Sequence, residues 1–226
     1  MPRLYGISFH PSSARESSER FAVRPSSPDM KIPLLRILCS LALGSVVSGA
    51  EEAGSTGPQT KPAFTFDDVQ YFHRWSQNDQ HEFTPQGQED LEKWTDMITV
   101  NGYPDAKDAD ALAEKANAVL DNYKKHQAMV LKTDSVPRTD DRDAEHFIAV
   151  AFPRPSFVEI VFARFKLVDG EGCSVVHSHR IYGKKAGDEA SAWLKTNGQA
   201  RQKTLMEWKT IPSSASLRKE LLRTRS

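Results

Sequence analysis

The sequence predicts an α+β domain, mainly an antiparallel sheet with one long amphipathic helix and a C-terminal helix packed on it. Three observations support this prediction. Four β-rich segments follow one another between residues 128 and 182. The pair Asp169-Gly170 separates the last two segments, as is typical of an antiparallel hairpin. Helical periodicity is found before these segments, over 108–126, and after them, from Asp188 onward.

The first elements of the domain are short and rich in aromatic side chains. Residues 64–75 fit a strand or a helix, because their apolar side chains satisfy both periods. Residues 81–85 are expected to be extended up to the proline, and β-branched residues favour a strand over 94–100. Residues 108–126 form the clearest element, an amphipathic helix. Its apolar face carries Leu112, Ala116, Val119, Leu120 and Tyr123.

The second half of the domain is predicted to contain four strands and a closing helix. The strands are expected over 128–133, 147–152, 157–168 and 173–182. The helix is expected to begin near Asp188, a good N-cap residue, and to stop at Gly198, with one more helical piece over 199–208. This order of elements resembles the sandwich of PsbP-like proteins, which are small exported proteins. The resemblance lies in element order alone and assigns no residue a role.

Residues 30–50 have the three-part layout of a secretory signal peptide. Basic residues at Lys31 and Arg36 precede an uncharged run over 37–47, and the small residues Ser48-Gly49-Ala50 follow it. The run is shorter than the roughly 20 apolar residues of a membrane-spanning helix. We therefore expect export to the periplasm or the extracellular space, with no transmembrane span after signal cleavage.

The remaining segments are assigned from composition. Residues 1–29 are expected to be a non-native or disordered N-terminal extension, and 51–62 a Gly/Ser/Thr/Pro-rich linker. Residues 63–212 are expected to form a single α+β domain, and 213–226 a basic disordered tail. The 226 residues have a formal net charge of zero. A domain without a clustered basic face is not expected to bind nucleic acid.

The pattern His177-Ser178-His179 is the sharpest candidate for chemistry. On a strand both imidazoles share one face, with Cα atoms about 6.6 Å apart. A hairpin turning through 169–172 would place Arg164 opposite His177 and Phe162 opposite His179, which leaves the histidines without a third metal ligand. We therefore predict no metal and no cofactor. The candidate ligand-binding residues are His177, His179, Arg164, Arg180, Tyr182 and Lys184.

Two functional hypotheses remain open from the sequence. The sequence favours an exported, non-enzymatic binding or envelope accessory protein, whose partner is an unknown small ligand or an envelope protein. This preference rests on the signal peptide and on a sequence that contains no G-x-S-x-G, H-E-x-x-H or C-x-x-C motif. The alternative is an exported metal-dependent or hydrolytic enzyme that uses His177 and His179.

Overall fold

The computed structural model describes residues 61–223. Within them the chain is α+β, as predicted, with one eight-stranded antiparallel sheet in the order β1-β2-β3-β4-β8-β7-β6-β5. The strands are β1 (Phe64–Phe66), β2 (Val69–Gln77), β3 (Gln80–Pro85), β4 (Asp96–Tyr103), β5 (Met129–Val136), β6 (Glu145–Pro153), β7 (Phe157–Val168) and β8 (Glu171–Tyr182). The helices are α1 (Ala109–Lys125), α2 (Ala186–Glu207) and α3 (Ser214–Arg223).

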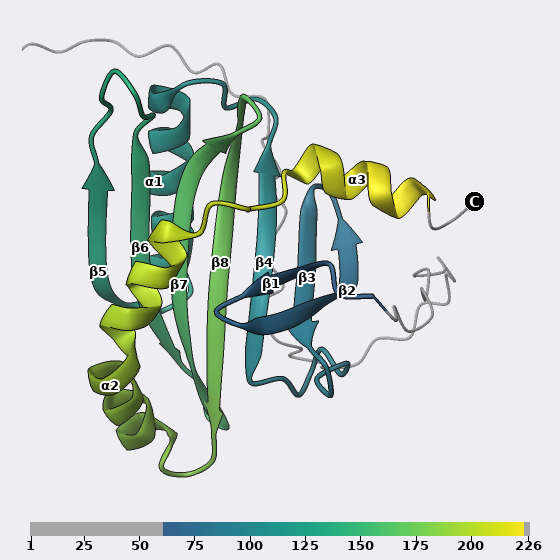
Figure 1. Cartoon of the computed structure of the whole chain (residues 1–226). Coiled ribbons are helices and arrows are strands. Elements are labelled where there is room, and N and C mark those ends of the chain that lie inside the picture. The colour runs from purple at the N-terminus through teal and green to yellow at the C-terminus, as the bar shows by residue number, and fades with distance from the viewer. Residues whose placement is uncertain (1–60, 224–226) are drawn as a thin grey trace, which may run out of the picture. The chain divides into compact units, whose positions relative to one another are not determined.

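The sheet consists of two meanders that meet at one ladder. Strands β1 to β4 follow one another in order, and β8 to β5 follow one another in reverse order. The ladder between β4 and β8 joins the two groups. Helix α1 connects β4 to β5 and lies behind the sheet, whereas α2 crosses the front face over β7 and β8 (Figure 1). Each half of the sheet is thus locally connected, and the seam between the halves pairs residues far apart in the chain.

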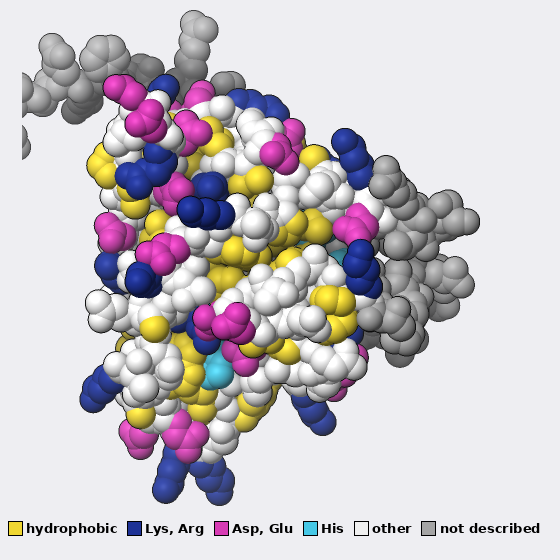
Figure 2. All heavy atoms as spheres, viewed as in Figure 1, with side chains coloured by type: hydrophobic (Ala, Val, Ile, Leu, Met, Phe, Trp, Pro, Cys, Tyr) yellow, Lys and Arg dark blue, Asp and Glu magenta, His cyan; other side chains and the backbone are white. Residues whose placement is uncertain are grey.

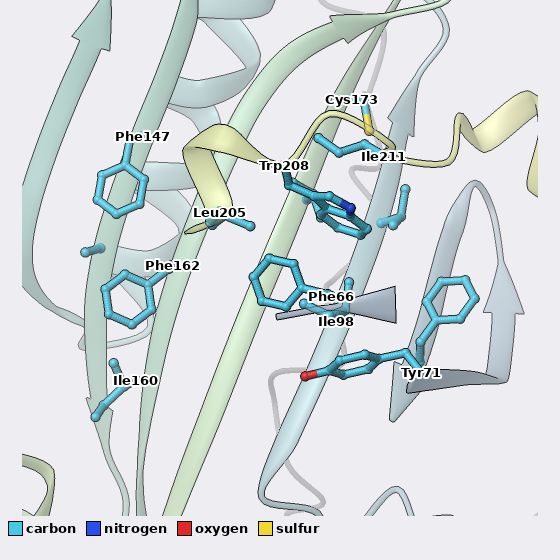
Figure 3. Close-up of a cluster of buried hydrophobic side chains, with 14 of the residues drawn as sticks. Phe66, Tyr71, Ile98, Phe147, Ile160, Phe162, Cys173, Leu205, Trp208 and Ile211 are labelled. Carbon is cyan, nitrogen blue, oxygen red and sulfur yellow. The ribbon is translucent and has the colours of Figure 1, made fainter. Parts of the chain in front are cut away.

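The main core lies between the sheet and α2. Phe147, Phe162 and Ile98 point forward from the sheet towards Leu205 and Trp208 (Figure 3). Phe66, from the β1–β2 hairpin, packs against Trp208 with ring centroids 5.0 Å apart. Burial of such side chains stabilises the fold by about 1.5–3 kcal/mol each. The hairpin and α2 therefore cover the front face together.

Helix α2 does not stop at Gly198, where the sequence predicted an end. It continues without a break to Glu207. Leu205, in the part beyond the glycine, is fully buried against the core. Tertiary packing therefore outweighs the roughly 1 kcal/mol by which a glycine weakens a helix interior.

The C-terminal segment also differs from the sequence prediction. The sequence predicted a disordered tail over 213–226, but Ser214–Arg223 form α3, which packs on β3 and β4. Leu217 is buried, and Ser214 lies so close to the sheet that a Cβ atom on Gly102 would be 2.5 Å from the Ser214 Cβ. The prediction of a disordered tail rested on charge composition. It missed this helix because one buried leucine and one close backbone approach are enough to dock a short segment.

The predicted extension over 1–29 and the predicted signal peptide over 30–50 lie outside the described residues, as does the linker up to residue 60. Among residues 61–223, no helix combines the length and the apolar character needed to span a membrane.

Candidate functional site

The β7–β8 hairpin turns more tightly than the sequence analysis assumed. Asp169 and Gly170 alone form the turn, with φ of 53° and 77°. Two positive φ values are typical of a type I′ turn, which matches the twist of a hairpin. Val168 consequently pairs with Glu171.

This turn shifts the register by two residues. Phe162 lies opposite His177 and Arg164 lies opposite Val175, so the prediction of Arg164 opposite His177 is wrong. A shift of two residues leaves every side chain on its original face. His177 and His179 therefore share one face of β8, which is the face covered by α2.

Asp96, the first residue of β4, completes the site. It pairs with His179 across the β4–β8 ladder. Asp96 Oδ1 lies 2.9 Å from His179 Nδ1 and 3.5 Å from His177 Nε2. One carboxylate oxygen thus faces both imidazoles. The sequence analysis missed Asp96, because nothing in the sequence shows that β4 pairs with β8.

His177 is fully buried, with 0 % exposure. Its ring lies between Phe66 and Phe162, at centroid distances of 5.7 and 6.5 Å. Burial lowers its pKa, which keeps the ring neutral. Neither ring nitrogen makes a hydrogen bond, because 3.5 Å from Asp96 is too long for a good one. A buried polar atom without a partner costs about 1–3 kcal/mol, so burying His177 in this way destabilises the fold.

His179 is partly exposed and stacks on α2. Its ring lies 4.3 Å from the Trp193 ring at an interplanar angle of 14°. The hydrogen bond to Asp96 and the stacking on Trp193 fix the orientation of the imidazole. Burial by itself raises the pKa of Asp96, but the hydrogen bond to His179 and the proximity of both imidazoles outweigh burial and hold the pKa well below its ordinary range.

Tyr71 lies near Asp96, and Arg201 lies near His177. The Tyr71 hydroxyl points from β2 towards β4 (Figure 3). Burial raises the pKa of Tyr71, and the negative charge of Asp96 adds to the effect, so the phenol stays protonated. Arg201, on α2, pairs with Asp67 in the β1–β2 turn at 2.5 Å. This ion pair links the two elements that cover the front face, where hydrophobic side chains gather between charged ones (Figure 2).

The other predicted site residues do not join the histidines. Arg164 shares their face but forms a buried bidentate ion pair with Glu145, at 2.8 and 2.9 Å. Its Nη1 also donates to the backbone carbonyls of Leu205 and Trp208, at the end of α2. Arg164 therefore anchors the helix to the sheet.

Arg180 and Tyr182 point to the opposite face of the sheet. The Arg180 guanidinium pairs with Glu159 at 2.9 Å and lies 3.9 Å from the Trp94 ring centroid. The Tyr182 hydroxyl donates to the Trp94 carbonyl, and Lys184 is exposed. The predicted set thus divides into one pair, His177 and His179, and residues engaged elsewhere. Residues 61–223 contain no group of three or more His, Cys, Asp and Glu side chains arranged to hold a metal ion.

Comparison with known proteins places the chain in a family. One family model matches residues 58–212, which span the whole sheet and α2. The chain belongs to this family. The comparison with curated proteins gave no match.

Among solved structures, two that are similar to this chain are a yeast protein and a human protein. The Ran-binding protein Mog1p of Saccharomyces cerevisiae matches with 12% identity and a TM-score of 0.42, over 61% of this chain and 82% of that one. Human STARD10 matches with 11% identity and a TM-score of 0.25, over 61% of this chain and 74% of that one.

Proposed function

We propose that the protein is an exported, non-enzymatic binding domain that holds a small ligand against His177. The observation that supports this function is the fully buried imidazole whose two nitrogens have no hydrogen-bond partner. Buried polar groups in folded proteins are almost always paired, and exceptions call for a water, an ion or a function. A ligand that supplies the missing partners would recover the cost of burying His177.

The surroundings of His177 define the class of ligand. Phe66, Phe162 and Trp193 provide aromatic surfaces beside the two histidines. A neutral imidazole offers one donor and one acceptor. A full charge at this depth would lose its hydration without gaining a free counter-ion, because Asp96 is hydrogen-bonded to His179 and Arg201 is paired with Asp67. The site therefore favours a planar, uncharged ligand whose polar end carries both a donor and an acceptor.

Three probes of similar shape test this proposal: benzamide, benzoate and benzylamine. Benzamide is uncharged and carries a donor and an acceptor, whereas the other two are charged at neutral pH. We expect benzamide alone to shift the imidazole ¹⁵N resonances of His177 in the full exported chain, and to raise the melting temperature.

The matched variants are His177→Phe and His146→Phe. His146 is partly exposed on β6 and faces away from α2. We expect His177→Phe to abolish the benzamide response and His146→Phe to retain it. An unchanged response in His177→Phe, or no response in the wild type, contradicts the proposal.

One observation favours a second candidate, a hydrolytic enzyme. The 2.9 Å contact between Asp96 Oδ1 and His179 Nδ1 orients an imidazole as general bases are oriented. Hydrolysis of p-nitrophenyl acetate is the measurement. A rate that falls at least about tenfold in both His179→Ala and Asp96→Asn would promote this candidate over the binding domain.

Export is tested separately by intact-mass measurement of the secreted protein. We expect a mature chain that begins at Glu51, after Ser48-Gly49-Ala50. A mature form that retains residues 30–50 would contradict the signal-peptide assignment.

A further inference from the structure

Strand β5 is the edge strand of the sheet next to β6. Among the described residues it forms a ladder with β6 and with no other strand. Seven of its eight residues are exposed. Its outer edge therefore presents backbone donors and acceptors to which another strand could bond.

The edge also exposes a contiguous apolar segment. Met129, Val130 and Leu131 are exposed by 58, 42 and 42 %, and they are among the most exposed large hydrophobic residues of the described chain. Scattered apolar residues on a surface are normal, but three in succession on an open strand are typical of a pairing surface.

The charges of β5 are complementary to those of a second, antiparallel copy of the same strand. Lys132 and Asp134 lie two residues apart on one face of the strand, with Lys132 Nζ 3.3 Å from Asp134 Oδ2. When two copies of β5 pair antiparallel about Thr133, Lys132 lies opposite the partner's Asp134. By symmetry, Asp134 lies opposite the partner's Lys132.

We propose that β5 pairs with β5 of a second copy, so that one antiparallel sheet continues across a symmetric dimer. Charged side chains, inward-pointing charges and β-bulges all protect strand edges against pairing. Here an aspartate two residues away makes the lysine complementary to its own strand. The β-bulge between Val130 and Lys132 lies outside the central pairs of this register, which are formed by residues 132–134.

The dimer is expected to be weak and dependent on concentration. A single pair of eight-residue strands buries less surface than a standard interface of about 1,600 Å². Cross-strand pairs of opposite charge contribute about 0.2–1 kcal/mol each, and like charges in the same positions are destabilising. Charge reversal should therefore change the dissociation constant measurably without touching the core.

Sedimentation velocity of the full exported chain tests the proposal, over about 5 to 500 µM, a range suited to a small interface. We expect Lys132→Asp and Asp134→Lys each to raise the dissociation constant at least about tenfold. The double variant restores opposite charges in the pair and is expected to return the constant to within about threefold of the wild type.

The matched control uses Asp121 and Lys124, an exposed ion pair on α1 at 3.7 Å. Asp121→Lys and Lys124→Asp are expected to leave self-association unchanged. A monomer at every concentration, a double variant that stays dissociated, or control variants that dissociate equally would each overturn the proposal. All the positions changed are exposed, so circular dichroism should show folded protein throughout.

Discussion

Arg164 and His177 lie on the same face of the sheet, under the same helix, and both are buried. Arg164 has a bidentate carboxylate and two backbone carbonyls as partners. His177 has two aromatic rings around it and no hydrogen bond. Arg164 has the partners expected of a structural residue. A buried polar group without partners, such as His177, destabilises the fold and is therefore a candidate for binding.

The largest expected effect is on the Arg164 side of this comparison. Arg164→Met takes the bidentate counter-charge from buried Glu145, which keeps only the longer contact to Lys166 at 3.8 Å, and removes two hydrogen bonds at the end of α2. We expect the free energy of unfolding to fall by about 3–5 kcal/mol, measured by urea denaturation. The double variant with Glu145→Met should regain much of the loss. If the single variant loses less than about 1 kcal/mol, Arg164 does not anchor α2.

A smaller effect is expected for Asp96→Asn. Asparagine keeps the shape but loses the charge that the imidazoles contact. Because Asp96 is partly exposed, we expect a loss of about 1 kcal/mol. Thermal unfolding measures it, and Asp90→Asn, in the exposed turn before β4, is the control. Equal losses in the two variants would show that the imidazoles gain nothing from the carboxylate.

His177→Phe is expected to act in the opposite direction. Phenylalanine is close to histidine in shape, and it removes two unpaired nitrogens from the core. We expect the free energy of unfolding to stay level or to rise by up to about 1 kcal/mol, while the benzamide response is lost. His177→Ala would instead leave a cavity and is expected to destabilise. A clear loss of stability in His177→Phe would mean that the imidazole has a structural partner.

Stability is also expected to depend on pH below neutrality. Burial lowers the pKa of His81 from 6.5 to about 4, and burial also lowers that of His177. The unfolded chain therefore takes up protons at these sites before the folded chain does. Stability should fall as the pH drops from about 6.5 to about 4, with little change between pH 8 and 7. The His177→Phe substitution should reduce the dependence of the free energy of unfolding on pH. An unchanged dependence would exclude His177 as a contributor.

Local features of the fold could be predicted from the sequence, and long-range ones could not. The periodicity of Leu112, Ala116 and Tyr123 predicted α1, and Asp169-Gly170 predicted the β7–β8 hairpin. Strand periodicity placed both histidines on one face. The partners of these residues come from distant segments: Asp96 is 83 positions from His179, and neither propensity nor spacing encodes that pairing.

Turn length limited the prediction as well. The sequence identified the hairpin but not whether two or four residues close it, and that difference moved Arg164 from His177 to Val175. The role of Arg164 depends on Glu145 and on carbonyls at the end of α2, so no local pattern could reveal it.

The seam between β4 and β8 gives the histidine site a further property. Each meander can form its hairpins from neighbouring residues, but the ladder at the seam must close a long loop, which slows its formation. Asp96 contributes from one half and the two histidines from the other. The site therefore comes into existence only when the halves join, and a molecule bound there would oppose their separation. Amide hydrogen exchange along β4 would record that effect as slower opening of the seam.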